Sequence, residues 1–139
     1  MKRIILLIYF SYLGADFLPY ISPGIKITFN QELGFSISNQ ITFGLISDDI
    51  GLGVTTGYGR IIDKNKNFQY TDFQISNGLK DRMILNGFGF GLIYDRSNLN
   101  FKLKAWTGFA LLLTYEHIFW NYLPGNLGFV GVLPLAKPL

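Results

Sequence analysis

Hydrophobic and polar residues alternate with a period of two along most of the chain, which predicts β-strands rather than helices. Apolar side chains occupy odd positions across residues 25–37, interrupted by Gln31, and polar side chains such as Lys26 and Glu32 occupy even positions. Residues 38–40 then have the composition of a turn. Further alternating runs are expected at 41–47, 50–59, 68–76, 83–94, 99–107, 109–119 and 127–133. Because no helical segment separates these runs, they predict a single antiparallel up-and-down β-barrel of about eight strands.

Two expected hairpins place large apolar side chains on one face and small or charged ones on the other. The turns are Asp48–Asp49 and residues 95–98. The apolar faces then carry Phe43 opposite Val54, Leu45 opposite Leu52, Phe90 opposite Leu103 and Leu92 opposite Phe101, with Phe88 on the same side. The reverse faces carry Thr42 opposite Thr55, Gly44 opposite Gly53, Gly89 opposite Lys104 and Gly91 opposite Lys102. Glycine leaves space for a long side chain inside a narrow closed barrel, so the apolar faces are expected to point outward.

Charged residues make up 15% of the chain, and most of those that follow the first segment fall in expected turns. The charged residues inside strands occupy the reverse faces and are expected to form an interior polar cluster of Lys26, Glu32, Lys102, Lys104 and Glu116. Because a buried charge must be paired, Glu32 and Glu116 are the candidate partners of the two later lysines. The strand that contains Asp72 has an ambiguous phase, so its membership stays open. The expected outer faces carry no charge, as contact with lipid requires.

Two segments have interpretations of their own. Lys2 and Arg3 precede an apolar run at residues 4–13, which is the pattern of a signal peptide over residues 1–15, followed by one barrel domain over residues 16–139. The alternative is a retained first strand or an interfacial anchor. Residues 105–123 are long enough for a transmembrane helix, although Glu116 and His117 are unfavourable in lipid.

The alternating pattern over residues 25–133 and the signal-like start resemble small bacterial outer-membrane β-barrel proteins. This resemblance implies an exported protein in the outer membrane, with membrane lipid as its partner and a structural or membrane-organising role. A barrel of about eight strands has an interior just filled by side chains, so an open pore is not expected. The alternative is a soluble exported barrel whose apolar faces enclose a lipid or small apolar ligand. Aromatic residues expected either in an interfacial belt or in barrel packing are Trp106, Tyr115, Trp120 and Tyr122.

The residues provide no recognisable catalytic or cofactor site. The chain has no cysteine and one histidine, which excludes thiolate zinc, iron–sulfur and multi-histidine metal centres. Glu116 and His117 are neighbours on an expected strand, so their side chains diverge and do not form an acid–base pair. The glycines of residues 87–91 have strand spacing and no following helix, unlike a phosphate loop. The net charge of +3 is scattered, which argues against nucleic acid as a partner. We therefore expect a protein that is not an enzyme and has no cofactor or metal.

Overall fold

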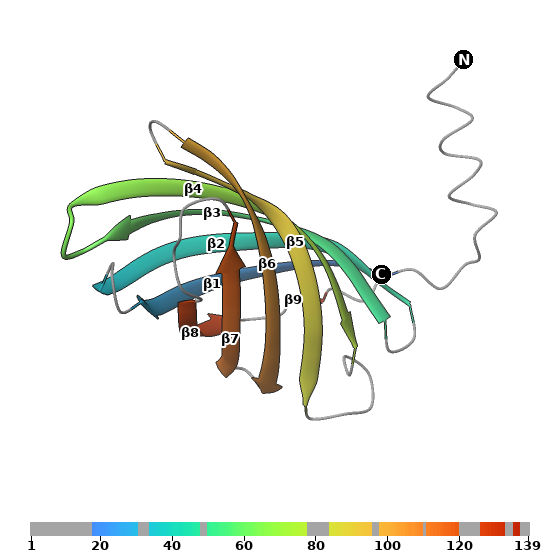
Figure 1. The fold of residues 1–139 in the computed structure, drawn as a ribbon. Helices are drawn as coiled ribbons and strands as arrows, with labels where there is room; N and C mark the ends of the chain where they lie inside the picture. Colours follow the sequence, from blue (N-terminus) through green and yellow to red (C-terminus); the bar gives the residue numbers. More distant parts are fainter. Residues whose placement is uncertain are drawn as a thin grey trace, which may run out of the picture.

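The computed structural model describes residues 18–30, 34–47, 50–77, 84–95, 98–109, 111–119, 126–132 and 135–136. Most of these residues form β-strands, shown in Figure 1. The strands are β1 (Leu18–Asn30), β2 (Gly34–Ser47), β3 (Ile50–Ile61), β4 (Lys66–Asn77), β5 (Leu85–Asp95), β6 (Asn98–Phe109), β7 (Leu111–Ile118), β8 (Asn126–Val132) and β9 (Leu135–Ala136). Within the described ranges, no helix has the length and hydropathy of a membrane span. The expected signal peptide at residues 1–15 lies outside the described residues.

The sheet closes on itself as an antiparallel up-and-down barrel, which confirms the fold predicted from the sequence. Each strand from β1 to β8 pairs with its neighbour along the chain, and β1 also pairs with β8. The short strand β9 continues β8 along β1, because Gly24 faces Val132 and Ile21 faces Leu135 in one unbroken register. The barrel therefore has eight strand positions around its wall, although nine strands are distinguished.

The strand register fixes how far the barrel is staggered. A path of directly paired residues leaves β1 at Pro19 and returns to β1 at Phe29, so the stagger is ten residues, from residue 19 to residue 29. The path runs through Leu45, Leu52, Ile75, Phe88, Ala105, Tyr115 and Leu127. A stagger of this kind requires strands tilted by roughly 35–45° around a core that side chains can fill.

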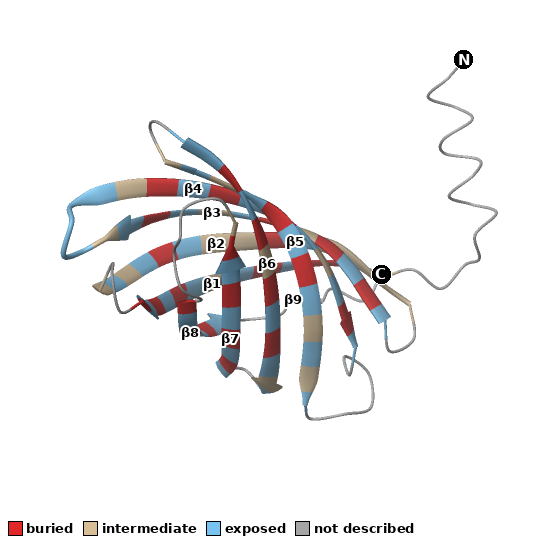
Figure 2. Cartoon of the chain, viewed as in Figure 1, coloured by how far each residue is buried: buried red, intermediate tan, exposed pale blue. Residues whose placement is uncertain are grey.

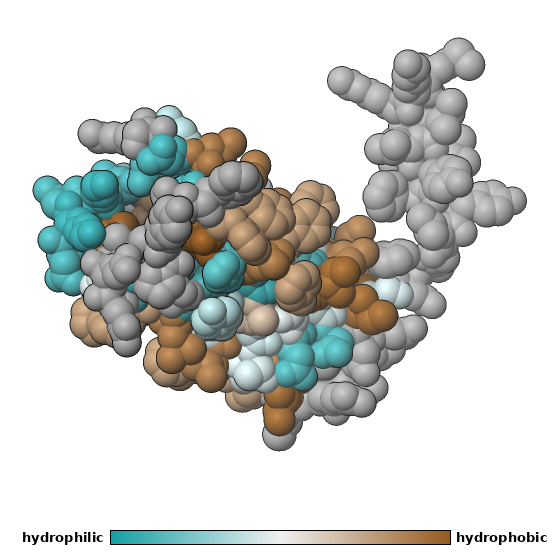
Figure 3. Space-filling view, in the orientation of Figure 1, coloured by the Kyte–Doolittle hydropathy of each residue, from teal (hydrophilic) through white to brown (hydrophobic). Residues whose placement is uncertain are grey.

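Burial alternates along β1, along most of β2 and along β3 to β8, and the alternation is inverted relative to a water-soluble protein (Figure 2). Among the described residues, 26 large hydrophobic side chains are exposed and 7 hydrophobic residues are buried. The interior instead holds lysine, aspartate, glutamate, asparagine and threonine side chains. Figure 3 shows hydrophobic side chains over much of the wall, whereas hydrophilic ones gather at the tip around the β3–β4 turn, where residues 62–66 are exposed. The apolar faces thus point outward, and the alternative of a soluble barrel with an apolar interior is wrong.

The boundary between the first two strands differs from the prediction. The sequence indicated one strand over residues 25–37 and a turn at residues 38–40, but β1 ends at Asn30 and β2 runs without a break from Gly34 to Ser47. Ser38 and Gln40 point into the barrel, where both contact the Tyr70 hydroxyl. The prediction of a turn at residues 38–40 is therefore wrong, because the polar residues there lie on the inward face of a strand.

Smaller differences concern the later strands. The helix considered for residues 105–123 is wrong, because the described part of that segment forms the end of β6 and then β7. Trp106 points inward and is 9% exposed, so it does not belong to an interfacial belt, whereas Tyr115 lies on the outer wall. Trp120 and Tyr122 lie outside the described residues. Arg60 belongs to β3 rather than to the following turn. That turn uses Asn65 at φ 54°, a backbone conformation that asparagine tolerates.

Candidate functional site

Five charged side chains cross the barrel interior in alternating sign. Lys26 Nζ lies 2.6 Å from Glu116 Oε1, and the same oxygen lies 3.3 Å from Lys102 Nζ. Asp72 Oδ2 lies 3.1 Å from Lys102 Nζ and 2.9 Å from Lys104 Nζ. We call this row the charge chain, in the order Lys26, Glu116, Lys102, Asp72 and Lys104. Each of its members is at most 8% exposed, so lysine and carboxylate compensate one another away from solvent.

The charge chain includes four of the five residues expected in the interior cluster. The structure brings Lys26, Lys102, Lys104 and Glu116 together. Glu32 lies outside the described residues, so its expected contact with a lysine stays a prediction. Asp72, whose place the sequence left open, is fully buried and is the carboxylate that contacts Lys104.

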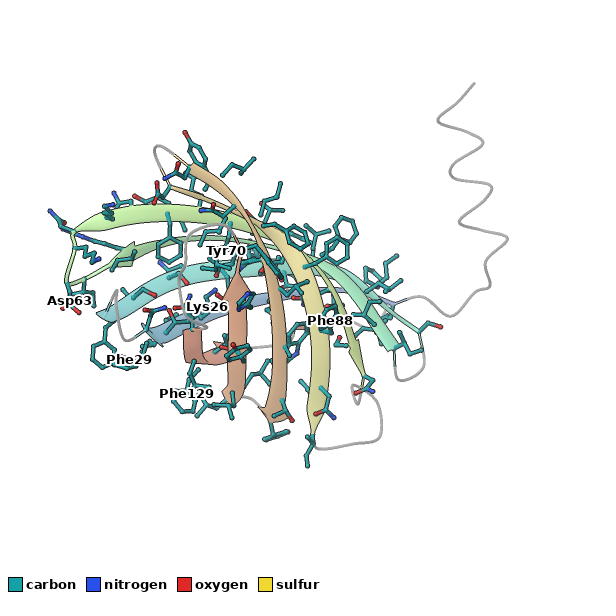
Figure 4. All side chains as sticks on the ribbon, in the orientation of Figure 1. Lys26, Phe29, Asp63, Tyr70, Phe88 and Phe129 are labelled. Carbon is teal, nitrogen blue, oxygen red and sulfur yellow. The ribbon has the colours of Figure 1, made fainter. Side chains whose placement is uncertain are left out.

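Tyr70 supports the charge chain and was not identified from the sequence. Its ring is 2% exposed and lies 4.0 Å from Lys26 Nζ and 4.0 Å from Lys102 Nζ, as in cation–π contacts. Its hydroxyl donates a hydrogen bond of 2.9 Å to Gln40 Oε1. Gly57 on β3 leaves room for the ring, since a Cβ atom at that position would overlap it. In Figure 4 Lys26 and Tyr70 lie within the curved sheet, whereas Phe29 and Phe129 point away from it.

A neutral hydrogen-bond network continues the polar interior from Lys104 toward β2. Lys104 Nζ donates to Gln74 Oε1 at 3.0 Å, and Thr55 Oγ1 donates to the same oxygen at 2.8 Å. The hydroxyls of Thr42 and Thr55 lie 2.7 Å apart, on residues that face each other as the hairpin register predicted. A connected polar network of this kind fixes one arrangement of the interior, because each unmade bond would be costly at low dielectric.

The charge chain lies between two internal cavities. One cavity, of about 70 Å³, is lined by Tyr20 near the start of β1 and by Ser76 near the end of β4. The other cavity, of about 230 Å³, lies beside Asn30 and Asp95. Lys26 and Glu116 line both cavities, and their side chains meet at 2.6 Å. The Lys26–Glu116 ion pair therefore forms a partition across the interior.

The outer wall carries all the apolar residues for which contact with lipid was predicted. Phe43, Leu52, Phe88, Phe90, Leu92 and Phe101 are 38–53% exposed, and Leu45, Val54 and Leu103 are half-buried by their neighbours. Phenylalanine rings follow one another across the strands, with centroids 6.1 Å apart for Phe73 and Phe90 and 6.3 Å apart for Phe90 and Phe101. Glu116 points inward and His117 outward, so the predicted divergence of this pair is confirmed.

Comparison with known proteins adds information about the fold. No protein-family model and no curated protein matches the chain. A solved structure titled "De novo design of transmembrane beta-barrels" matches with a TM-score of 0.55 and 14% sequence identity, over 82% of this chain and 95% of that chain. The chain thus shares the fold of a designed transmembrane β-barrel. At this identity the likeness shows the fold alone, and it agrees with the general resemblance to membrane barrels without assigning a family.

Proposed function

We propose that this protein is exported and integrated in an outer membrane as a closed β-barrel with a structural or membrane-organising role. One observation carries the proposal: the large hydrophobic residues point outward, and the charged residues of the described strands point inward, with the exception of Arg60 near the end of β3. Soluble monomers rarely expose a continuous apolar patch of more than a few hundred Å². The exposed wall of this barrel includes residues from β1 to β8, so lipid is the partner that its chemistry favours.

Interior packing supports a closed barrel rather than a pore. The Lys26–Glu116 ion pair divides the lumen, and Tyr70 and Lys102 fill the space beside it. Opening a continuous water path would require separation of buried charges that now compensate one another. We therefore propose that the folded barrel conducts no ions at porin level.

The proposal excludes the role of a soluble carrier for apolar ligands. Such a carrier needs an apolar interior, whereas most of the buried side chains in the described strands are polar or charged, and Lys102, Thr55 and Asp72 are the most deeply buried of them. We further propose that the protein is not an enzyme and needs no cofactor or nucleic acid, in line with the expectation from the sequence.

Membrane fractionation of cells that express the full chain tests the proposal. We expect the protein in the membrane pellet after carbonate washing and in the supernatant only after detergent extraction. Density-gradient separation then distinguishes the outer from the inner membrane. Recovery as a soluble protein without detergent would contradict the membrane role, and recovery in the inner membrane would contradict the proposed location.

A further inference from the structure

One side of the outer wall differs from the rest in being polar. We call this area the outer patch, formed by Tyr58, Arg60, Asn67, Gln69 and Tyr94 near the β3–β4 turn. Tyr58, Gln69 and Tyr94 are direct neighbours across β3, β4 and β5, and Arg60 faces Asn67 in the adjoining pair toward the turn. All five residues lie at strand positions whose side chains point out of the barrel. A hollow of about 210 Å³ lies among Tyr58, Asn67, Gln69 and Tyr94.

Among the described residues, the outer patch does not continue as a polar ring around the barrel. On other strands, the same end of the outer wall carries Phe29 and Phe35, with ring centroids 5.0 Å apart, and Phe101 and Phe119, with centroids 5.7 Å apart. Arg60 is also the one Lys, Arg, Asp or Glu among the outward-facing residues of the described strands. A single cation with two amides and two tyrosines is thus concentrated on one side.

We infer that the outer patch binds the headgroup of an anionic phospholipid. The inference rests on the proposed membrane location. Arg60 supplies a guanidinium, which matches the geometry of a phosphate oxygen pair. Asn67 and Gln69 supply amide donors, and Tyr58 and Tyr94, which also line the hollow, each carry a hydroxyl donor. The backbones of the two tyrosines are two strand spacings apart, roughly 10 Å, and Gln69 lies between them, so a bound headgroup would contact all three side chains.

The residues next to the outer patch suit the rest of a lipid molecule. Along the outward phase of β3, β4 and β5, the patch is followed by Thr56, Thr71 and Leu92, and beyond the two threonines by Val54 and Phe73. Phe73 is 61% exposed and Leu92 is 47% exposed, so acyl chains can lie against them. Tyrosine and arginine are typical of the headgroup level of a membrane. A lipid whose phosphate contacts Arg60 would place its chains over this apolar surface, which a free phosphate ion cannot do.

Native mass spectrometry of the protein released from nanodiscs with equal amounts of phosphatidylcholine and phosphatidylglycerol tests the inference. We expect the parent protein to retain phosphatidylglycerol preferentially. Arg60→Gln should lower this preference about fivefold, the value for one cation near an anionic lipid surface, and Arg60→Lys should preserve most of it. Lys64→Gln is the matched control, because it removes the same charge from the exposed neighbouring turn and should preserve the preference.

Four results would overturn the inference. The preference would depend on general charge attraction if Lys64→Gln reduced it as much as Arg60→Gln, or if neither variant reduced it. The site would bind free phosphate if excess inorganic phosphate displaced phosphatidylglycerol from the parent protein. The outer patch would be a protein interface if the parent formed a dimer that Arg60→Gln dissociated. Protease protection and gel mobility in the same nanodiscs report insertion separately, so failure of the proposed function is distinguished from failure of the lipid site.

Discussion

For substitutions in the charge chain, we expect the loss in the free energy of unfolding to depend on the charges that remain unpaired, and not on how deeply the replaced residue is buried. Lys102 is central and fully buried, with contacts to Asp72 at 3.1 Å and Glu116 at 3.3 Å. Its removal still leaves two complete ion pairs, Lys26–Glu116 at 2.6 Å and Lys104–Asp72 at 2.9 Å. Removal of Glu116 leaves three ammonium groups and one carboxylate.

We therefore expect Glu116→Gln to be more harmful than Lys102→Met. Breaking a buried ion pair from one side costs about 3–5 kcal/mol, because the remaining charge is uncompensated. Lys102→Met keeps the length of the side chain and the balance of charge, so its cost should be about 2 kcal/mol, the value of one hydrogen bond to a charged group. When Lys102→Met and Glu116→Gln are combined, the loss in the free energy of unfolding should be less than the sum of the two single losses. The reason is that removing Lys102 relieves part of the excess positive charge left by Glu116→Gln.

Denaturant titration of the refolded protein in detergent micelles measures these differences in the free energy of unfolding, with tryptophan fluorescence and gel mobility as readouts. Lys64→Met is the control, because the same replacement at an exposed turn residue should change stability by less than about 0.5 kcal/mol. Equal costs for Lys102→Met and Glu116→Gln, or a larger cost for Lys102→Met, would refute the reasoning from charge balance.

The remaining expectations concern packing, the outer wall and conductance. Tyr70→Phe should lower the free energy of unfolding by about 1 kcal/mol, because the hydroxyl contact is lost. Tyr70→Leu should lower it by a further 0.5–2 kcal/mol for each cation–π contact, or about 1–4 kcal/mol for the two. Equal losses for the two variants would contradict a role for the ring. Gly89→Leu should cost about 1–3 kcal/mol, because even a Cβ atom there would lie 2.9 Å from Lys104 Cε. Gly131→Ala is its control, since a Cβ atom at Gly131 meets nothing within 4 Å; similar unfolding midpoints for these two variants would contradict the packed interior. Phe90→Arg should lower the free energy of unfolding in vesicles by about 2–4 kcal/mol, and an unchanged free energy of unfolding would argue against contact with lipid. Planar-bilayer recording should show no stable conductance of porin size, and a large persistent channel would show that the interior is open.

Hairpin register was the most predictable part of the fold. The pairs Leu45–Leu52 and Phe90–Leu103 are both present in the structure, so the predicted registers are confirmed. A shift of the register by one residue would have placed the phenylalanines inside and the lysines outside. The alternation in the two strands and the short turn between them therefore predict the same register. The closed barrel followed from the glycines that oppose Lys102 and Lys104.

The first hairpin was hidden by the parity of its register. In β1 and β2 odd residues pair with odd residues, as Phe29 does with Phe35, so the period-two pattern continues across the turn without a change of phase. Periodicity therefore contains no signal for that turn. The inward residues Ser38 and Gln40 are polar because this interior is polar, and in sequence such residues are indistinguishable from a turn.

The partners within the charge chain depend on contacts between distant strands. Asp72 and Lys104 lie on β4 and β6, on either side of β5, where Gly89 and Gly91 leave space between them. A single sequence indicates which residues of each strand point inward. It does not indicate which long side chains meet across a strand such as β5, whose inward positions are glycines. Tyr70 has the same phase as Asp72, so a clear phase for β4 would have placed both residues inside.

Spin-label accessibility in lipid vesicles tests the central claim that the apolar wall faces lipid. The chain has no cysteine, so Phe90→Cys, Phe129→Cys and Asp63→Cys each provide one labelling position. If the wall faces lipid, oxygen, which concentrates in the bilayer, will relax labels at positions 90 and 129 more than a water-soluble nickel complex does. The opposite order is expected at the exposed turn position 63. Strong relaxation by the nickel complex at positions 90 and 129, equal to that at position 63, would show that this wall faces water and would contradict the account.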